Sequence, residues 1–183
     1  MHSVEAWGTT LPEVTREYYC DRLLPDAPGR YLRAVDCRAE PAALMPWLRM
    51  LRVAPYSYDW IDNGGRRSPN TLSPQALHPG DRMMTIFTLV DIQEPKDPAD
   101  AGELTVRIRP GRPRQVFGDV AVTYRAVPGG MGSRLVAALR VTDAPGVAGG
   151  VRRRLLAYGD VVMMRKQLRT LAALAESTAA SPG

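Results

Sequence analysis

The chain has 183 residues and a mass of 20.1 kDa, and its 24 Lys and Arg outnumber 19 Asp and Glu, giving a net charge of +5. This length suits a single domain with a sizeable core. With two cysteines and two histidines, the chain is not a disulfide-dense scaffold, and a Cys/His zinc site would lack ligands. No apolar run approaches the roughly 18 residues of a membrane helix, and no signal peptide is apparent.

We therefore expect a cytoplasmic protein with reduced thiols, no metal, no cofactor and no integral membrane segment. The basic charge is almost all arginine, because Lys96 and Lys166 are the two lysines of the sequence. The one tight basic cluster, residues 152–154, has no interleaved aromatic residues of the kind that favour nucleic-acid binding. We interpret the arginines as a solvated surface and expect no nucleic-acid partner. The oligomeric state is left open.

The composition along the chain predicts three parts. Residues 1–29 form an N-terminal extension that contains a helix-like stretch at 12–24 and ends in a Pro- and Gly-containing breaker run. A single domain is predicted over 30–176. A flexible tail at 177–183 follows it.

A strand and a short helix open the predicted domain. In the strand, residues 30–38, a period of two places four side chains on one face, namely Tyr31, Arg33, Val35 and Cys37. A helix then begins at Pro41, a favourable first-turn residue. Its apolar face is formed by Leu44, Trp47, Leu48 and Leu51, at helical spacing. Pro46 lies inside this pattern and should distort or split the helix.

The middle of the chain has the period of β-strands. From Asp81, the residues Met84, Ile86, Thr88 and Val90 alternate with Met83, Thr85, Phe87 and Leu89, so both faces of this strand are largely apolar. Further strands are predicted at 104–109, 120–125 and 134–141, with a turn region at 112–115. Because the connections are short, we expect an antiparallel meander.

A long helix is predicted from Val151 to Glu176. Tyr158 lies in the apolar stripe of its first half, and Asp160 is followed directly by Val161, Val162, Met163 and Met164. A carboxylate in this position is costly to bury unless it is paired. We expect Arg125 or Arg107 to project from the sheet and pair with Asp160; a role in catalysis or in orienting a ligand, and simple exposure, remain alternatives.

Three segments resemble a known family. At residues 47–49, 54–63 and 159–167, the sequence is similar to bacterial members of the SRPBCC superfamily, START-like helix-grip proteins often labelled polyketide cyclase/dehydrase or lipid-transport proteins. The resemblance covers roughly residues 30–176. It implies an α+β helix-grip fold, in which a curved antiparallel sheet wraps around a long C-terminal helix and encloses a cavity. Because this superfamily includes carriers, receptors and enzymes, the fold does not decide the chemistry.

The aromatic segment is the first candidate site. Tyr56, Tyr58 and Trp60 have apolar rings with polar tips, which suits a pocket for an amphipathic ligand, although they could equally fill the core. Asp59 lies among them and could act as an acid or base; turn capping and ion pairing are the alternative for such acids before Gly-Gly. The methionines Met83, Met84, Met163 and Met164 could form an adaptable lining of this pocket, or they could be ordinary core residues.

We expect the protein to bind a small hydrophobic or amphipathic molecule in the cavity between the sheet and the C-terminal helix. The predicted ligand-binding residues are Tyr56, Tyr58, Trp60, Met84, Ile86, Thr88, Tyr158, Met163 and Met164. The alternative is a polyketide cyclase or aromatase acting on a ligand in the same cavity. In that case Arg125 or Tyr124 would stabilise an enolate or oxyanion, and Asp160 or Asp59 would move the proton. A ligand-free interaction module is a third possibility.

Overall fold

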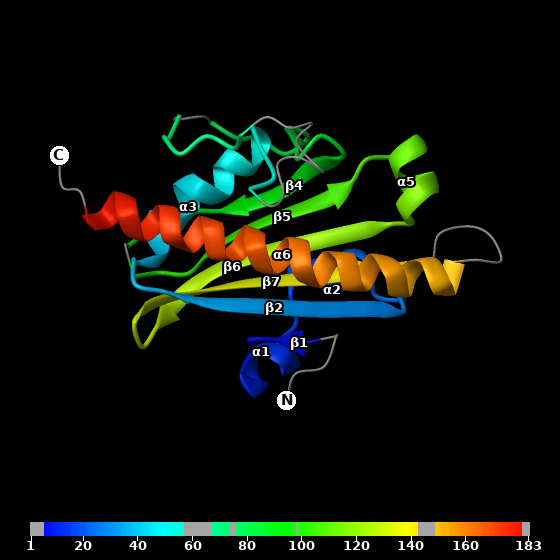
Figure 1. Ribbon diagram of the computed structural model, residues 1–183, viewed down its shortest axis with the longest axis horizontal. Helices are drawn as coiled ribbons and strands as arrows, with labels where there is room; N and C mark the ends of the chain where they lie inside the picture. Colours follow the sequence, from blue (N-terminus) through cyan, green and yellow to red (C-terminus); the bar gives the residue numbers. More distant parts are fainter. Residues whose placement is uncertain (1–5, 57–66, 74–75, 98, 143–148, 181–183) are drawn as a thin grey trace.

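The computed structural model describes residues 6–56, 67–73, 76–97, 99–142 and 149–180, with the side chains of residues 149–162 left out. Figure 1 shows a sheet crossed on one face by a long C-terminal helix. The strands are β1 (Ala6–Trp7), β2 (Gly29–Cys37), β3 (Arg82–Met83), β4 (Phe87–Gln93), β5 (Gly102–Ile108), β6 (Val120–Gly129) and β7 (Gly132–Val141). The helices are α1 (Leu11–Thr15), α2 (Tyr19–Leu23), α3 (Pro41–Arg49), α5 (Arg112–Phe117) and α6 (Gly149–Ala180), and a 3-10 turn covers Met50–Arg52.

The sheet has the strand order β1-β2-β7-β6-β5-β4-β3. Strands β3 to β7 pair with their sequence neighbours in antiparallel fashion, so the predicted meander is confirmed. Strand β2 joins this meander through β7, also antiparallel, while the two-residue β1 lies parallel to β2. The short connections explain the meander, because parallel neighbours would need long crossovers.

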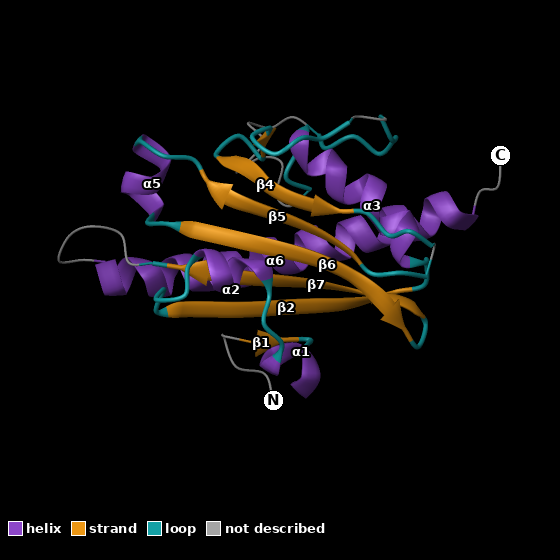
Figure 2. Ribbon diagram, turned by 180° about the vertical axis from the view of Figure 1, so that it is seen from behind, coloured by secondary structure: helices purple, strands orange, loops and turns teal. Residues whose placement is uncertain are grey.

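Helix α6 lies along the inner face of the curved sheet, as Figures 1 and 2 show from opposite sides. Its sheet-facing side chains repeat at helical spacing and are all buried: Met164, Leu168, Leu171, Ala172 and Ala175. The helix extends beyond both predicted ends. It begins at Gly149 and continues to Ala180, so the first residues of the predicted tail are helical.

Helix α3 packs beside α6 and completes the main core. Its predicted apolar face is confirmed, since the four side chains concerned are at most 1% exposed: Leu44, Trp47, Leu48 and Leu51. Pro46 lies inside α3, which continues to Arg49 and then tightens into the 3-10 turn, so the helix is not split. This arrangement of a curved sheet, a long C-terminal helix and short flanking helices is the α+β helix-grip fold that the sequence predicts.

A second, smaller core lies on the outer face of the sheet, under α2 (Figure 2). Cys20 anchors α2 there, because its backbone N–H donates to Thr123 Oγ1 at 2.9 Å and its thiol to Ala138 O at 3.3 Å. Cys37 belongs to the main core on the inner face, so the two thiols are free and lie on opposite sides of the sheet. The predicted helix at 12–24 is divided into α1 and α2.

The N-terminal strand also contacts the C-terminal helix. The ring of Trp7 in β1 lies beneath two guanidinium groups of α6, with the Cζ atoms of Arg165 and Arg169 at 4.6 and 5.3 Å from its centroid. Such cation–π contacts add about 0.5–1 kcal/mol each at exposed sites. Strand β1 is therefore held against α6 as well as against β2.

The predicted strand at 83–90 is wrong in its middle. Strand β3 ends at Met83, the backbone turns through positive φ at Met84 (41°) and Thr85 (64°), and β4 begins at Phe87. A β-bulge between Leu89 and Asp91 shifts the alternation again. The predicted turn region at 112–115 is likewise wrong, because these residues lie in α5.

Candidate functional site

A chain of polar contacts crosses the interior between the sheet and α6. The Tyr124 hydroxyl of β6 donates to Gln167 Oε1 of α6 at 2.7 Å, and Gln167 Nε2 donates to the carbonyl of Pro55 at 2.5 Å. Tyr124 is 1% exposed and Gln167 is 4% exposed. Burying these groups is tolerable because each is hydrogen-bonded. The contacts tie the sheet, the helix and the segment after α3 together at one point.

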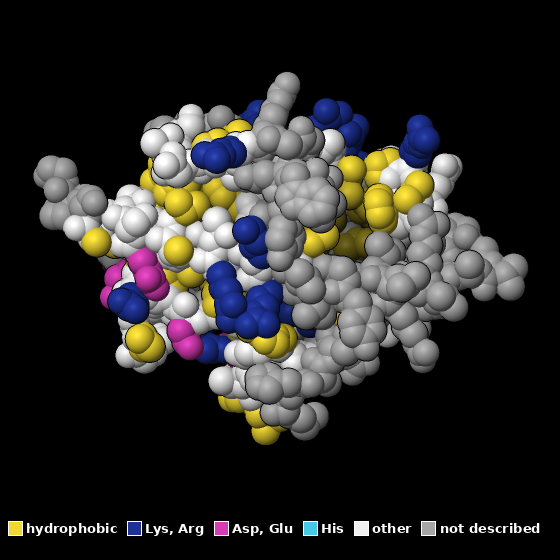
Figure 3. All heavy atoms as spheres, viewed as in Figure 1, with side chains coloured by type: hydrophobic (Ala, Val, Ile, Leu, Met, Phe, Trp, Pro, Cys, Tyr) yellow, Lys and Arg dark blue, Asp and Glu magenta, His cyan; other side chains and the backbone are white. Residues whose placement is uncertain are grey.

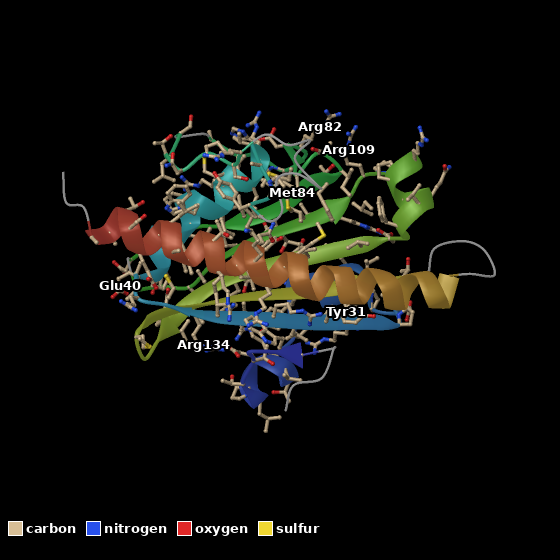
Figure 4. All side chains as sticks on the ribbon, viewed as in Figure 1. Tyr31, Glu40, Arg82, Met84, Arg109 and Arg134 are labelled. Atoms are coloured by element: carbon tan, nitrogen blue, oxygen red, sulfur yellow. The ribbon has the colours of Figure 1, made fainter. Side chains whose placement is uncertain are left out.

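Two methionines surround this polar chain. The Sδ atom of Met84 lies 3.5 Å from Gln167 Nε2 and 4.0 Å from the Tyr124 hydroxyl, and the Sδ atom of Met164 lies 3.9 Å from the same hydroxyl. Met84 belongs to the turn between β3 and β4, and Figure 4 labels it near α6, whose Gln167 it contacts. Thioethers are flexible and polarizable, so they can adapt to differently shaped contents.

The backbone beside this polar chain is strained. Among the described residues, the non-glycine residues with positive φ are Tyr56, at 55°, and the neighbouring pair Met84 and Thr85. Tyr56 follows Pro55, whose carbonyl Gln167 binds, and the Met84 N–H donates to Leu51 O at 2.9 Å. Contacts with other segments thus hold the backbone of these residues in conformations that cost about 1–3 kcal/mol each. Residues strained in this way are concentrated at binding and catalytic sites.

Tyr56 and Trp47 form the aromatic wall of this interior. Their rings meet edge to face, with centroids 6.2 Å apart and planes at 84°, and both side chains are 1% exposed. The indole Nε1 of Trp47 is buried and, in the described part of the chain, has no hydrogen-bond partner. A buried N–H donor of this kind is uncommon in a folded protein.

Arg33 brings a charge to the same face of the sheet. It is 0% exposed and shares the inner face of β2 with Tyr31, Val35 and Cys37, as the strand period predicts. Its guanidinium lies over the ring of Tyr31, with Cζ 5.8 Å from the centroid, and its Nη1 donates to Leu32 O at 2.8 Å. Arginine stays charged even when buried, so the interior contains a permanent cation.

Parts of the inner face are half-buried rather than fully buried. Leu168 and Leu171 of α6 are 0% exposed, whereas Tyr31, Phe87 and Val120, near the end where α5 lies, are half-buried, as are Val35 and Ile92 near the opposite end. Figure 3 shows apolar side chains at the surface beside α5, with Lys and Arg side chains near them.

The structure corrects the predicted positions of three residues. Arg125 lies on the outer face of the sheet and pairs with Glu103, and Arg107 lies on the same face and pairs with Asp119. Neither guanidinium points toward α6, because each follows an inward-facing neighbour along its strand. Thr88 pairs with Arg107 across β4 and β5 and also faces outward. Arg125 and Thr88 are therefore not part of the interior site.

The remaining predicted residues divide into three groups. Tyr56, Tyr124, Met84 and Met164 are brought together by the fold, while Ile86 and Met163 are half-buried. Tyr58, Asp59 and Trp60 lie outside the described residues, and so do the side chains of Tyr158 and Asp160 in α6.

Sequence reasoning did not include two interior groups, Arg33 and Gln167, among the site residues. The signal for Gln167 is a polar residue inside the otherwise apolar repeat of Met164, Leu168 and Leu171. The signal for Arg33 is an arginine on the apolar face of a strand. In both cases a polar residue occupies a position where the pattern predicts an apolar one. Polar residues at the surface fit the pattern, so such an exception indicates a buried polar side chain.

The described residues contain no group of three or more His, Cys, Asp and Glu side chains that could hold a metal ion. No helix within the described ranges combines the length and the apolar character that crossing a membrane requires.

No protein-family model and no curated protein matches the chain. Protein MLL2253 from Mesorhizobium loti matches in structure with 14% identity and a TM-score of 0.49, covering 81% of this chain and 98% of that protein. The di-domain ARO/CYC StfQ of the steffimycin biosynthetic pathway matches with 16% identity and a TM-score of 0.49, over 87% of this chain and 54% of that protein. A member of the major latex protein family from Arabidopsis thaliana matches with 15% identity and a TM-score of 0.40, over 79% and 94%.

The curved sheet of seven strands among the described residues and the long C-terminal helix give this chain the α+β helix-grip fold.

Proposed function

We propose that the protein binds a small hydrophobic or amphipathic molecule between the inner face of the sheet and α6. The observation that carries this proposal is the buried chain from Tyr124 through Gln167 to the Pro55 carbonyl, set among methionines and aromatic rings. Ligand sites for small molecules combine mostly apolar walls with a few fixed polar groups. The unpartnered indole N–H of Trp47 adds a donor that a ligand oxygen could use.

The ligand would enter from the end of the sheet where α5 lies. The half-buried side chains of Tyr31, Phe87 and Val120 lie at this end of the inner face. A molecule with an apolar body could cover these side chains and direct a polar group toward Tyr124 and Arg33. Covering such side chains stabilises a complex by about 25 cal/mol per Å² of apolar surface removed from water.

Native mass spectrometry of the protein purified from its own host tests the proposal. We expect a co-purifying small molecule, which denaturation releases and whose mass identifies its chemical class. For the apo protein, the probe is the neutral fluorophore N-phenylnaphthylamine, and we expect saturable binding with enhanced emission.

A steric variant with a matched control locates the binding. Val120→Trp fills the inner face near α5, and Met131→Trp adds the same side chain at a hairpin position that is 62% exposed. We expect the first variant to lose fluorophore binding and the second to retain it, with circular dichroism confirming that both fold. Unchanged binding in folded Val120→Trp would contradict the proposed location.

A second candidate is cyclisation of a flexible poly-ketone in the same interior. It is favoured by one observation: a phenol donor, Tyr124, and a permanent cation, Arg33, share the inner face of the sheet. Tyr124 would donate to the ketone oxygen, and Asp160 or Asp59 would take the proton from the carbon that becomes the nucleophile. Holding the chain folded can itself remove several kcal/mol of barrier.

Carrier and enzyme respond differently to substitution. In a carrier, Asp160→Asn and Tyr124→Phe should change affinity for the co-purified molecule only modestly. In a cyclase, the same variants should bind the poly-ketone but convert it slowly, with a lower kcat. If Asp160→Asn unfolds the protein, the carboxylate is structural and Tyr124→Phe alone decides between the two.

A further inference from the structure

A separate pocket lies on the outer face of the sheet, away from the interior between the sheet and α6. It has a volume of about 400 Å³, within the range of small-molecule sites. One wall is the apolar segment that joins α2 to β2, including Leu23, Leu24 and Ala27. The opposite wall contains Arg107 of β5, Arg114 of α5 and Asp119, which directly precedes β6.

The polar wall is built around one buried carboxylate. Asp119, 4% exposed, accepts from Arg107 Nε at 3.0 Å and Nη2 at 2.6 Å, and Arg114 Nη2 lies 2.5 Å from its Oδ2. Two guanidinium groups therefore share one carboxylate. Each guanidinium has five N–H donors, so most of these donors are not used by Asp119.

Hydrogen bonds fix both walls. Arg140 donates to Leu24 O at 3.1 Å and to Pro25 O at 2.6 Å, which holds the apolar wall. The Asp119 N–H donates to Thr142 Oγ1 at 2.7 Å, and the Thr142 N–H donates back to Asp119 O at 2.9 Å. A site that is already ordered loses little entropy when it binds a ligand.

From this geometry we infer that the pocket is a binding site for a small organic carboxylate, whose anionic group contacts Arg107 and Arg114 and whose apolar group lies on Leu23, Leu24 and Ala27. Arginine pairs well with carboxylates because its planar fork matches their two oxygens. The other acid of the lining, Asp26, is an exposed residue, where water and salt screen its charge.

The site would act independently of the interior one, and two arginines on α5 provide a matched test. Arg114, half exposed, contacts Asp119, whereas Arg112 is exposed and has no ion pair within the described residues. Arg114→Gln leaves Asp119 paired with Arg107, so the fold should survive. Arg112→Gln removes the same charge from the same helix without touching the pocket.

The experiment is an amide NMR titration of the full chain with hexanoate and, separately, with hexanol. We expect saturable hexanoate shifts at Leu24, Ala27, Asp119 and Thr142, weakened about tenfold or more in Arg114→Gln. Arg112→Gln should behave like the parent protein, and hexanol should bind much more weakly. Leu23→Trp, which narrows the pocket without changing its charge, should also lose hexanoate.

Three results would overturn the inference. Absence of saturable shifts would show that no carboxylate site exists. If Arg112→Gln and Arg114→Gln weakened hexanoate binding equally, the binding would come from general charge attraction and not from the pocket. Equal binding of hexanol and hexanoate would show an apolar surface that does not select an anion.

Discussion

Arg33 and Tyr124 lie in one row across the inner face of the sheet, each directly opposite Ala137 of β7. Neighbouring strands are about 4.8 Å apart, so the two backbones are separated by about 10 Å. The side chain between them is a methyl group. A cation and a phenol thus flank the smallest side chain of the row.

Enlarging Ala137 tests whether a ligand uses this row. Ala137→Leu and Ala138→Leu are neighbours on opposite faces of β7, and both positions are buried. We expect each to destabilise the protein by about 1–3 kcal/mol through overpacking. Only Ala137→Leu should also abolish binding of N-phenylnaphthylamine, measured by fluorescence titration under conditions where both variants are folded. Loss of binding in both variants would indicate a general structural effect.

The Tyr124–Gln167 hydrogen bond should contribute measurably to stability. Tyr124→Phe removes the donor and leaves a buried amide oxygen without it, which costs about 1–3 kcal/mol in the free energy of unfolding. Urea denaturation measures this loss. Tyr19→Phe, at a half-buried tyrosine on the outer face, serves as the control and should change stability by less than about 0.5 kcal/mol. Equal effects of the two substitutions would contradict the importance of the buried contact.

The Glu13–Arg134 ion pair predicts a pH dependence. Burial alone would raise the pKa of Glu13, but hydrogen bonds from Arg134 and Thr10 outweigh it and lower the pKa below its ordinary value of 4.5. Because the folded state holds the carboxylate more strongly than the unfolded state, the pair stabilises fully above about pH 4.5. This contribution is lost as the pH falls through the folded-state pKa.

Urea unfolding of Glu13→Gln across this range tests the pair. We expect the variant to be less stable than the parent protein at pH 7 and the difference to shrink toward zero in acid. Glu17→Gln, at an exposed glutamate, should show no such trend. A difference that stays constant with pH would mean that the loss is steric rather than electrostatic.

Both cysteines should be unreactive in the native protein. Burial raises the pKa of Cys20 to about 11 and also raises that of Cys37, and both residues are at most 1% exposed. The thiolate is the reactive form, so little of it exists at pH 8. We expect a disulfide reagent such as Ellman's to label neither thiol in the native state and both after denaturation. Rapid labelling of the native protein would contradict this burial.

Two glycines of the β6–β7 hairpin should respond differently to alanine. At Gly132, φ is +133° and an added Cβ would lie 2.4 Å from Arg38 O, whereas at Gly130 nothing lies within 4 Å. We expect Gly132→Ala to lower the free energy of unfolding by more than about 1 kcal/mol and Gly130→Ala to have little effect. Thermal unfolding of the pair measures the difference, and similar melting temperatures would contradict it.

The fold was predictable because its main elements follow clear periods. The apolar faces of α3 and α6 and the meander of β4 to β7 all come from spacing that local geometry dictates. The turn at Met84 and Thr85 was not predictable, because the apolar alternation continues through it. Positive φ at those residues depends on contacts made elsewhere in the fold, such as the Met84 N–H bond to Leu51 O.

The candidate site was predictable in part. Tyr124, Tyr56 and the two methionines were identified because they combine polar tips or soft atoms with apolar periods. Placing Arg125 beside Tyr124 was an avoidable error, since consecutive strand residues face opposite sides. The role of Gln167 could not be deduced, because its partner Pro55 lies 112 residues away in the sequence. Ion pairs on the outer face, such as Arg107–Asp119, could not be predicted either, because they depend on which segments lie side by side in the fold.

The pairing of β2 with β7 has a consequence for how the chain is made. The residues that face each other in this pair are about a hundred positions apart, and α6, which packs on β2, is later still. On the ribosome, β2 therefore leaves the exit tunnel long before its partner strand exists. Loop closure over such distances slows folding, so the sheet cannot close through β2 until β7 has emerged, and the edge of β2 that later pairs with β7 stays without that partner until then.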